Sequence, residues 1–217
     1  MARIIMKSPY LKPNSGGGKH RGNYAKYIAT REGVEILPRS GMADYIGERK
    51  GSNGLFSDAG KPIVLTHIEE ELDNHRGNVW GMIFSLKRED AERLGYNSAD
   101  QWMNLLRSRR NDIAKEMHIA PSNFRWYAAY HNDEKHPHVH MLAWSSNPHE
   151  PYLSKLGIAH IKQAITNDVF RDEKYHIYKK QTEARDSLKE EFRRRIVTIT
   201  NNLLNDPVKI SPELMVM

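Results

Sequence analysis

Short apolar runs in the first 150 residues predict the strands of a sheet. Val79–Leu86 is apolar almost throughout, which is typical of a strand that is covered on both faces and lies inside a sheet. The aromatic run Phe124–Tyr130 and the apolar run Val139–Trp144 lie on either side of a short polar stretch, and this order predicts a hairpin. Arg3–Met6 predicts a further strand near the start of the chain.

Apolar residues at spacings of three and four predict helices elsewhere in the chain. Asn23–Glu32 is predicted to be a helix that Asn23 caps and Gly33 ends, with Tyr24 and Tyr27 on one face. Five further helices are expected. The capping box Thr66–Glu69 opens a short helix that stops near Gly77, a second covers Arg88–Leu94, and a third is capped by Ser98 and runs to about Met117. The fourth is capped by Ser154, and the fifth runs from about Tyr175 to Leu204.

The order of these elements indicates an α+β fold, with a central, mainly antiparallel sheet and flanking helices, followed by a C-terminal helical extension. We expect a core domain over residues 1–150 and an extension over residues 151–217 that packs on or over it. Lys12–Gly22 and residues 38–62 are rich in glycine and predict irregular segments. The residues after Pro207 carry no pattern that would anchor them, so we expect the chain to be the N-terminal domain of a longer protein.

Composition narrows the chemistry that the chain supports. The sequence has no cysteine, which excludes disulfides, thiolate metal sites and a cysteine nucleophile, and which agrees with a reducing cytoplasm. No apolar run approaches the roughly 20 residues that span a bilayer, so no membrane partner is expected. The net charge of +6 favours an anionic partner. We expect the arginines at positions 107, 109 and 110 to lie on a solvated helix face.

A cluster of histidines in the predicted hairpin points to a metal site. His138 and His140 share one face of their strand because side chains alternate with period two, and His131 joins them if the two strands pair. Three converging imidazoles suit Zn²⁺, Mn²⁺, Ni²⁺ or Fe²⁺ and leave a coordination position open. His136 follows the same alternation but lies in the loop, where it is a substrate contact or a bystander.

Such a metal polarises a phosphoryl or carbonyl oxygen, or acidifies a bound water. The H-E-x-x-H pattern of zinc proteases and the zinc-deaminase signature are both absent from the sequence. The basic charge, the tyrosine-bearing helix and the basic glycine-rich segment favour a phosphodiester as the substrate. A tyrosine hydroxyl that attacks a phosphate would form a covalent phosphotyrosine.

Two motifs resemble those of conjugative relaxases, which belong to the HUH endonucleases. His131-x6-His138-x-His140, followed by the apolar run Met141–Trp144, resembles their third motif, and Tyr27–Gly33 resembles the first motif of the MobP-type relaxases. The resemblance covers roughly residues 1–145. It implies that Tyr27 is the nucleophile, with Tyr24 as the second candidate.

The chain departs from the family pattern at one position. Relaxases usually carry an acidic residue on a central strand that orients a metal histidine through its second ring nitrogen. Val79–Leu86 has no acidic residue. The orienting role is left to a backbone carbonyl, to Glu116 or Asp112 of the neighbouring helix, or to no residue.

The resemblance implies an enzyme that nicks one strand of origin-of-transfer DNA beside a hairpin, forms a 5′-phosphotyrosine and reseals the strand during conjugative transfer of a mobile element. It implies Mn²⁺ or Mg²⁺ as the metal, with Zn²⁺ or Ni²⁺ as alternatives, and an accessory DNA-binding protein and a coupling ATPase as partners. Two other hypotheses stay open: a three-histidine metal hydrolase with another substrate, and a non-catalytic DNA-binding module. The expected DNA contacts are Lys19, Arg21, Lys26, Arg31, Arg125 and His136.

Overall fold

The computed structural model of the 217-residue chain describes residues 4–11, 21–37, 53–58 and 63–205. The chain divides into two compact units, Met1–Val169 and Phe170–Met217. The first unit contains the sheet, and it extends through helix α7 (Lys155–Val169), whereas the sequence placed the division at residue 150. The second unit contains the long helix α8 (Arg171–Asn205). None of the described helices combines the length and apolar character needed to cross a membrane.

The sheet has six strands, and every pairing in it is antiparallel. The strand order is β1-β4-β6-β5-β3, and β2 pairs with β4 beside β1. This arrangement confirms the predicted α+β fold and the internal position of the apolar run that begins at Val79. The strands are β1 (Ile5–Lys7), β2 (Tyr10–Leu11), β3 (Leu55–Phe56), β4 (Val79–Ser85), β5 (Phe124–His131) and β6 (His138–Ser145).

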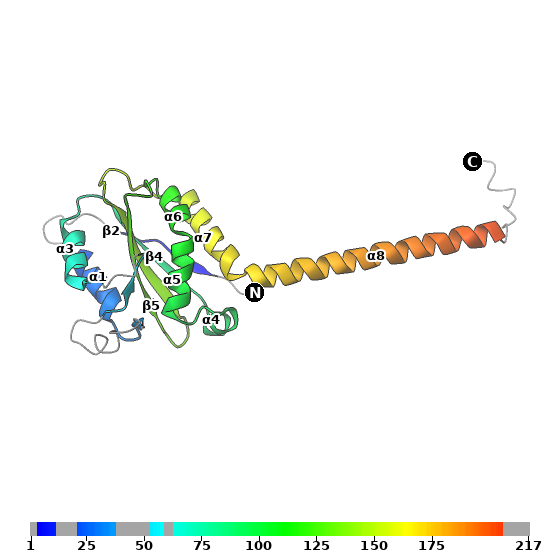
Figure 1. Ribbon diagram of the computed structural model, residues 1–217, viewed down its shortest axis with the longest axis horizontal. Coiled ribbons are helices and arrows are strands. Elements are labelled where there is room, and N and C mark those ends of the chain that lie inside the picture. The colour runs from blue at the N-terminus through cyan, green and yellow to red at the C-terminus, as the bar shows by residue number, and fades with distance from the viewer. Residues whose placement is uncertain (1–3, 12–20, 38–52, 59–62, 206–217) are drawn as a thin grey trace. The chain divides into compact units, whose positions relative to one another are not determined.

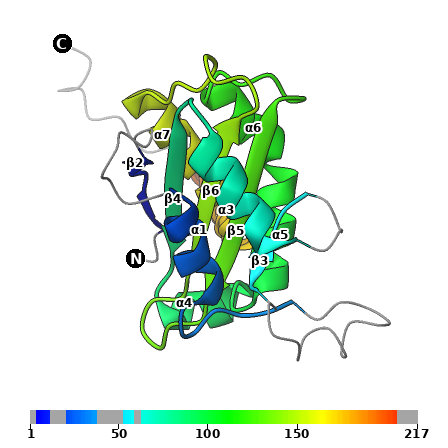
Figure 2. The same ribbon diagram turned by 90° about the vertical axis from the view of Figure 1, so that its left-hand side faces the viewer.

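Helices cover both faces of the sheet in the first unit (Figures 1 and 2). The helices α1 (Arg21–Thr30) and α3 (Leu65–Asn74) lie on one face, where Ile28 and Leu72 pack with Leu142 and Trp144 of β6 in a buried apolar cluster. The other face carries α5 (Ala99–Ser108), α6 (Arg110–Glu116) and α7, with α4 (Arg88–Leu94) near one end of the sheet.

The hairpin forms with the predicted strands and the predicted loop of residues 132–137. Its register places His131 opposite His138 and Ala129 opposite His140. Because side chains alternate along each strand, all three histidines point to the face that α1 covers. The fold therefore positions the candidate metal ligands beneath the tyrosine-bearing helix.

Two predicted helix starts are wrong in detail. Asn23 lies inside α1, which begins at Arg21, and the amide of Gly22 donates instead to the Asp73 carboxylate of α3 at 2.8 Å. A carboxylate from another helix thus satisfies an amide of the first turn, which leaves no capping role for Asn23. Thr66 also lies inside its helix, because α3 begins after Val64 with no side-chain cap.

The predicted helix from Ser98 to Met117 is divided into α5 and α6 at Arg109, whose φ and ψ are −100° and 4°. Arg109 pairs with Asp168 of α7 at 2.5 Å, and Arg107 and Arg110 bind the segment after β3. The three arginines that were expected on a solvated face therefore link separate parts of the first unit. The predicted cap of α7 is confirmed, since Ser154 Oγ accepts the Gly157 amide at 2.9 Å.

Candidate metal centre

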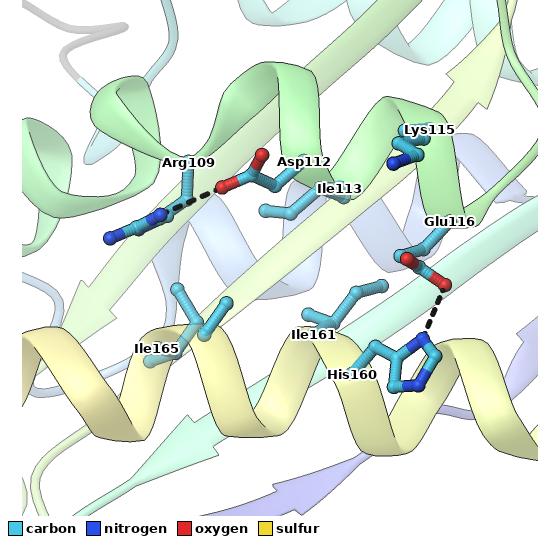
Figure 3. A pocket seen from close by; sticks show the side chains of 9 residues that line it. Arg109, Asp112, Ile113, Lys115, Glu116, His160, Ile161 and Ile165 are labelled. Atoms are coloured by element: carbon cyan, nitrogen blue, oxygen red, sulfur yellow. Dashed lines mark hydrogen bonds and ion pairs between the residues drawn. The ribbon is translucent and has the colours of Figure 1, made fainter.

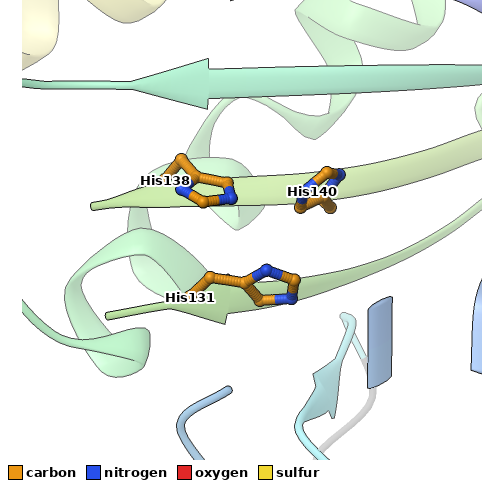
Figure 4. Close-up of side chains that lie close together, drawn as sticks. All are labelled: His131, His138 and His140. Atoms are coloured by element: carbon orange, nitrogen blue, oxygen red, sulfur yellow. The ribbon is translucent and has the colours of Figure 1, made fainter. Parts of the chain in front are cut away.

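Three histidine rings meet on one face of the hairpin (Figure 4), and residues of the same face, Ala129 and Leu142, pack against α1. The ring centroids of His131 and His140 are 4.8 Å apart, and those of His138 lie 5.1 Å and 5.0 Å from them. One nitrogen from each ring lies within 4.8 Å of the other two, so the cluster can hold a metal ion. The sequence prediction that these three histidines converge is confirmed.

Each histidine has an oxygen partner at its second ring nitrogen. His131 Nε2 lies 2.8 Å from the carbonyl oxygen of Ile28, and His138 Nδ1 lies 2.8 Å from that of His136. His140 Nδ1 lies 3.2 Å from the hydroxyl oxygen of Tyr24. A carbonyl oxygen can only accept a hydrogen bond, so the ring nitrogen that faces it must carry the proton. The other nitrogen of the neutral ring then has a free lone pair for a metal.

The nitrogen that His131 has left for a metal is buried and without a protein partner. His131 Nδ1 makes no hydrogen bond in the described part of the chain. An orphaned buried nitrogen is costly unless a ligand satisfies it. The residues present therefore fit a divalent cation bound through His131 Nδ1 and the Nε2 atoms of His138 and His140.

For His131 and His138, a backbone carbonyl takes the place of the acidic residue that usually orients a metal-binding histidine in relaxases. Asp112 and Glu116 do not supply a partner for the third histidine, because both lie in a pocket between α6 and α7 (Figure 3). Asp112 pairs with Arg109 at 2.8 Å, and Glu116 pairs with His160 at 3.1 Å. Of the alternatives left open by the sequence, the backbone carbonyl is the one found for His131 and His138.

Burial keeps the two innermost imidazoles neutral. Desolvation by burial lowers the pKa of His131 to about 4, against a smaller opposing effect of its bond to Ile28. Desolvation likewise lowers the pKa of His140 to about 3, and the neighbouring histidines lower it further. Neutral imidazoles are the form that binds metals, so these ligands need no deprotonation at pH 7.

The C-terminal turn of α1 directs one carbonyl group, that of Ile28, to the histidine cluster. The last four carbonyls of a helix have no amide partner within it. Outside partners satisfy three of them: Tyr27 O accepts the Arg31 amide, Ala29 O accepts the Gly54 amide, and Ile28 O meets His131. This negative end of the helix dipole would favour a cation at the centre.

The two candidate tyrosines occupy different environments on α1. Their rings stack with centroids 6.4 Å apart. Tyr24 is half-buried with its hydroxyl at His140, and desolvation raises its pKa. Tyr27 is 49% exposed, and the guanidinium carbon of Arg31 lies 5.3 Å from its ring centroid.

The expected DNA contacts have different surroundings. Arg21 is buried, and its guanidinium donates to the carbonyl oxygens of Leu11, His75 and Gly77, which contradicts its expected contact with DNA. Lys19 lies outside the described residues. Lys26 and His136 are exposed and Arg31 is partly exposed, whereas Arg125 lies near the start of β5, at the opposite end of the strand from His131.

Sequence reasoning missed Arg88, which organises the hairpin loop from α4. Its guanidinium donates to the carbonyl oxygen of Glu134 at 3.2 Å and to Asn132 Oδ1 at 2.7 Å, and it also contacts the carbonyl oxygen of Asp133. The loop that joins the two histidine-bearing strands is therefore tied to α4. No local motif marks Arg88, since its partners lie more than forty residues later in the chain.

An α+β fold with an antiparallel sheet, and a three-histidine cluster facing a tyrosine-bearing helix, define the protein as a relaxase. Residues 40–207 match the MobL relaxases, and the chain belongs to this family. Neither the curated proteins nor the solved structures include a significant match.

The match confirms the prediction of a conjugative relaxase and does not specify the MobP subtype. A relaxase is a DNA-nicking enzyme that binds origin-of-transfer DNA. The matched segment includes the three histidines and the helices α7 and α8, but it begins downstream of Tyr24 and Tyr27.

Proposed function

We propose that this relaxase cuts a single DNA strand at an origin of transfer by transesterification from Tyr27. The observation that carries the proposal is the convergence of three histidines beneath the helix that bears an exposed tyrosine. The Tyr27 oxygen bonds to the scissile phosphorus while the bond from phosphorus to the 3′ oxygen breaks. The tyrosine proton passes to solvent, the departing 3′ oxygen takes up a proton, and the DNA is left as a 5′-phosphotyrosine. Attack by the 3′-hydroxyl reverses these steps and reseals the strand.

The three histidines would hold Mn²⁺ or Mg²⁺, with Zn²⁺ or Ni²⁺ as alternatives. Nitrogen ligands favour Mn²⁺ over Mg²⁺, because Mg²⁺ prefers oxygen ligands and retains its water. When bound, the cation supplies positive charge to the non-bridging oxygens of the phosphate. His131, His138 and His140 remain neutral in this role, so the cation keeps its full charge for the phosphate.

The DNA path proposed here runs past the exposed side of α1 and the hairpin loop. Lys26 on α1, Arg31 just after α1 and His136 in the loop supply cationic or hydrogen-bonding groups, and the Arg31 guanidinium lies 5.3 Å from the ring centroid of Tyr27. Such groups bind the backbone of a single strand. A DNA hairpin beside the cut site, an accessory DNA-binding protein, a coupling ATPase and a cytoplasmic location complete the proposal.

The test is incubation of the protein with single-stranded origin DNA and Mn²⁺, followed by denaturing electrophoresis. We expect a covalent protein–DNA band that Tyr27→Phe abolishes and that Tyr127→Phe, a matched change further along the same sheet face, leaves in place. A persistent band in Tyr27→Phe would show that the nucleophile is another residue.

The same assay separates the two other hypotheses. A metal hydrolase that acts on another substrate would form no covalent band and would keep its activity in the tyrosine variants. A non-catalytic DNA-binding module would bind DNA with a steep salt dependence, and His138→Ala would not change that binding.

A further inference from the structure

The geometry points to Tyr24 as the positioning residue of the metal centre: its hydroxyl holds His140 in the tautomer and orientation that present Nε2 to the cation. The inference rests on the proposed metal binding by the three histidines. It does not depend on which residue attacks the DNA.

The first support is the isolation of His140 from other polar partners. Its Nδ1 lies 3.2 Å from the Tyr24 hydroxyl oxygen, and its side chain is buried. The residues paired with it across the sheet are Ile83 of β4 and Ala129 of β5, both apolar. Neither neighbouring strand therefore supplies the carboxylate that would orient this imidazole in other relaxases.

The second support is the comparison with the other two ligands. His131 and His138 each have a carbonyl oxygen at the ring nitrogen that faces away from the cluster. The Tyr24 oxygen occupies the corresponding position for His140. When Nδ1 carries the proton and donates to this oxygen, Nε2 keeps its lone pair for a metal; the opposite tautomer would leave Nε2 protonated and unable to bind.

The third support is that one helix provides both contacts. Tyr24 and Ile28 are four residues apart on α1 and therefore share a helix face. The hydroxyl of the first meets His140, and the carbonyl of the second meets His131. Helix α1 thus contacts two of the three histidines, each at the ring nitrogen that faces away from the cluster.

Space in the sheet matches this position of the tyrosine. Gly81 of β4 lies beneath the Tyr24 hydroxyl, and a Cβ atom at Gly81 would lie 3.8 Å from the hydroxyl oxygen and 3.3 Å from Pro9 Cγ. A side chain larger than alanine at Gly81 would therefore occupy the space that the phenol uses. The half-buried Tyr24 and the exposed Tyr27 then have separate roles, one toward the metal and one toward the DNA.

The test measures Mn²⁺ affinity by isothermal titration calorimetry on the full chain. Loss of a partner behind a metal-bound histidine typically weakens metal binding by about 10–100-fold, and we expect a loss of this size in Tyr24→Phe. Tyr27→Phe and the matched control Tyr127→Phe should bind Mn²⁺ within about twofold of the wild type, since neither removes a partner of a ligand. Wild-type affinity in Tyr24→Phe would overturn the inference.

A second measurement separates positioning from attack on the DNA. Tyr24→Phe should form less covalent protein–DNA adduct at Mn²⁺ near the wild-type dissociation constant, and raising the Mn²⁺ concentration should restore the adduct. An adduct that stays absent at saturating Mn²⁺ would identify Tyr24 as the nucleophile and would also overturn the inference.

Two controls keep the outcomes distinct. Circular dichroism checks folding, and Tyr24→Leu, which keeps an apolar side chain without the hydroxyl, replaces Tyr24→Phe if the latter does not fold. A wild-type protein that binds Mn²⁺ but forms no adduct would refute the cleavage chemistry and leave the affinity test intact. A wild-type protein that binds none of Mn²⁺, Mg²⁺, Zn²⁺ and Ni²⁺ would overturn both proposals.

Discussion

The Nε2 atom of His131 lies 2.8 Å from the carbonyl oxygen of Ile28, a residue 103 positions earlier in the chain. This contact joins the end of helix α1 to the hairpin that carries the three histidines. It satisfies a carbonyl that the helix itself leaves open, and it fixes which nitrogen of His131 is available to a metal. The tyrosine helix and the metal centre are therefore parts of one assembly.

Removal of the Arg88 side chain should loosen the metal centre from the side of the hairpin loop. Arg88→Ala takes away the donors that bind Asn132 and Glu134, so we expect a loss of about 1–3 kcal/mol in the free energy of unfolding. Mn²⁺ affinity should fall by about 10-fold if the loop sets the separation of the ligating strands. Urea denaturation and calorimetry measure the two effects.

Arg93→Ala provides the matched control for this change. Arg93 lies on the same helix and its side chain is 47% exposed, and exposed ion pairs contribute little, so its loss should change the free energy of unfolding by less than about 0.5 kcal/mol. Equal effects of the two substitutions would contradict a specific role of Arg88 in the loop.

The stability of the protein kept metal-free by a chelator should decrease as the pH falls from about 6.5 to about 4. Burial lowers the pKa of His131 to about 4 and that of His140 to about 3. In this pH window the unfolded chain takes up protons that the folded chain excludes, so acid favours unfolding. The loss should be on the order of 3 kcal/mol for each of the two histidines, because one pKa unit corresponds to about 1.36 kcal/mol.

Urea denaturation at several pH values measures this dependence, and two variants assign it. His131→Phe should reduce the decrease by about half, because one of the two histidines that take up a proton on unfolding is gone. His149→Phe, at an exposed position, should keep the wild-type dependence. A wild-type pH dependence in His131→Phe would show that other groups cause the acid sensitivity.

The hairpin could be predicted from the sequence because its signals are local. Alternating side chains on two adjacent runs and a six-residue loop between them are enough to place His131 opposite His138. The metal cluster follows from that register. The prediction of the cluster needs only the pattern of residues 124–144, which are adjacent in the sequence.

The surroundings of the cluster could not be predicted, because they depend on contacts between distant residues. The amide of Gly22 finds its cap in Asp73, 51 positions later, so the helix begins earlier than Asn23 indicates. The partners of the histidines come from α1 and from backbone carbonyls, which leave no mark in the sequence. Strand β3 (Leu55–Phe56) was missed because two residues are too few for a periodic pattern.

Arg21 provides the sharpest contrast between the sequence prediction and the structure. A basic residue beside a glycine-rich segment indicates a phosphate contact, yet its guanidinium donates to carbonyl oxygens of Leu11, His75 and Gly77 at 2.8–3.0 Å. Arg21→Gln should therefore lower the free energy of unfolding by about 2–4 kcal/mol, because buried carbonyls lose their charged donor. Binding of single-stranded DNA, measured well below the melting temperature, should keep its wild-type salt dependence.

Lys26→Gln should show the opposite result. Lys26 is exposed on the same helix, so its loss should change the free energy of unfolding by less than about 0.5 kcal/mol. If Lys26 neutralises one phosphate, the slope of log affinity against log salt should decrease by about 0.7 for a single strand. If Arg21→Gln instead keeps the wild-type stability and decreases the slope of log affinity against log salt, Arg21 contacts DNA. That result would contradict the structural role of its bonds to the carbonyl oxygens.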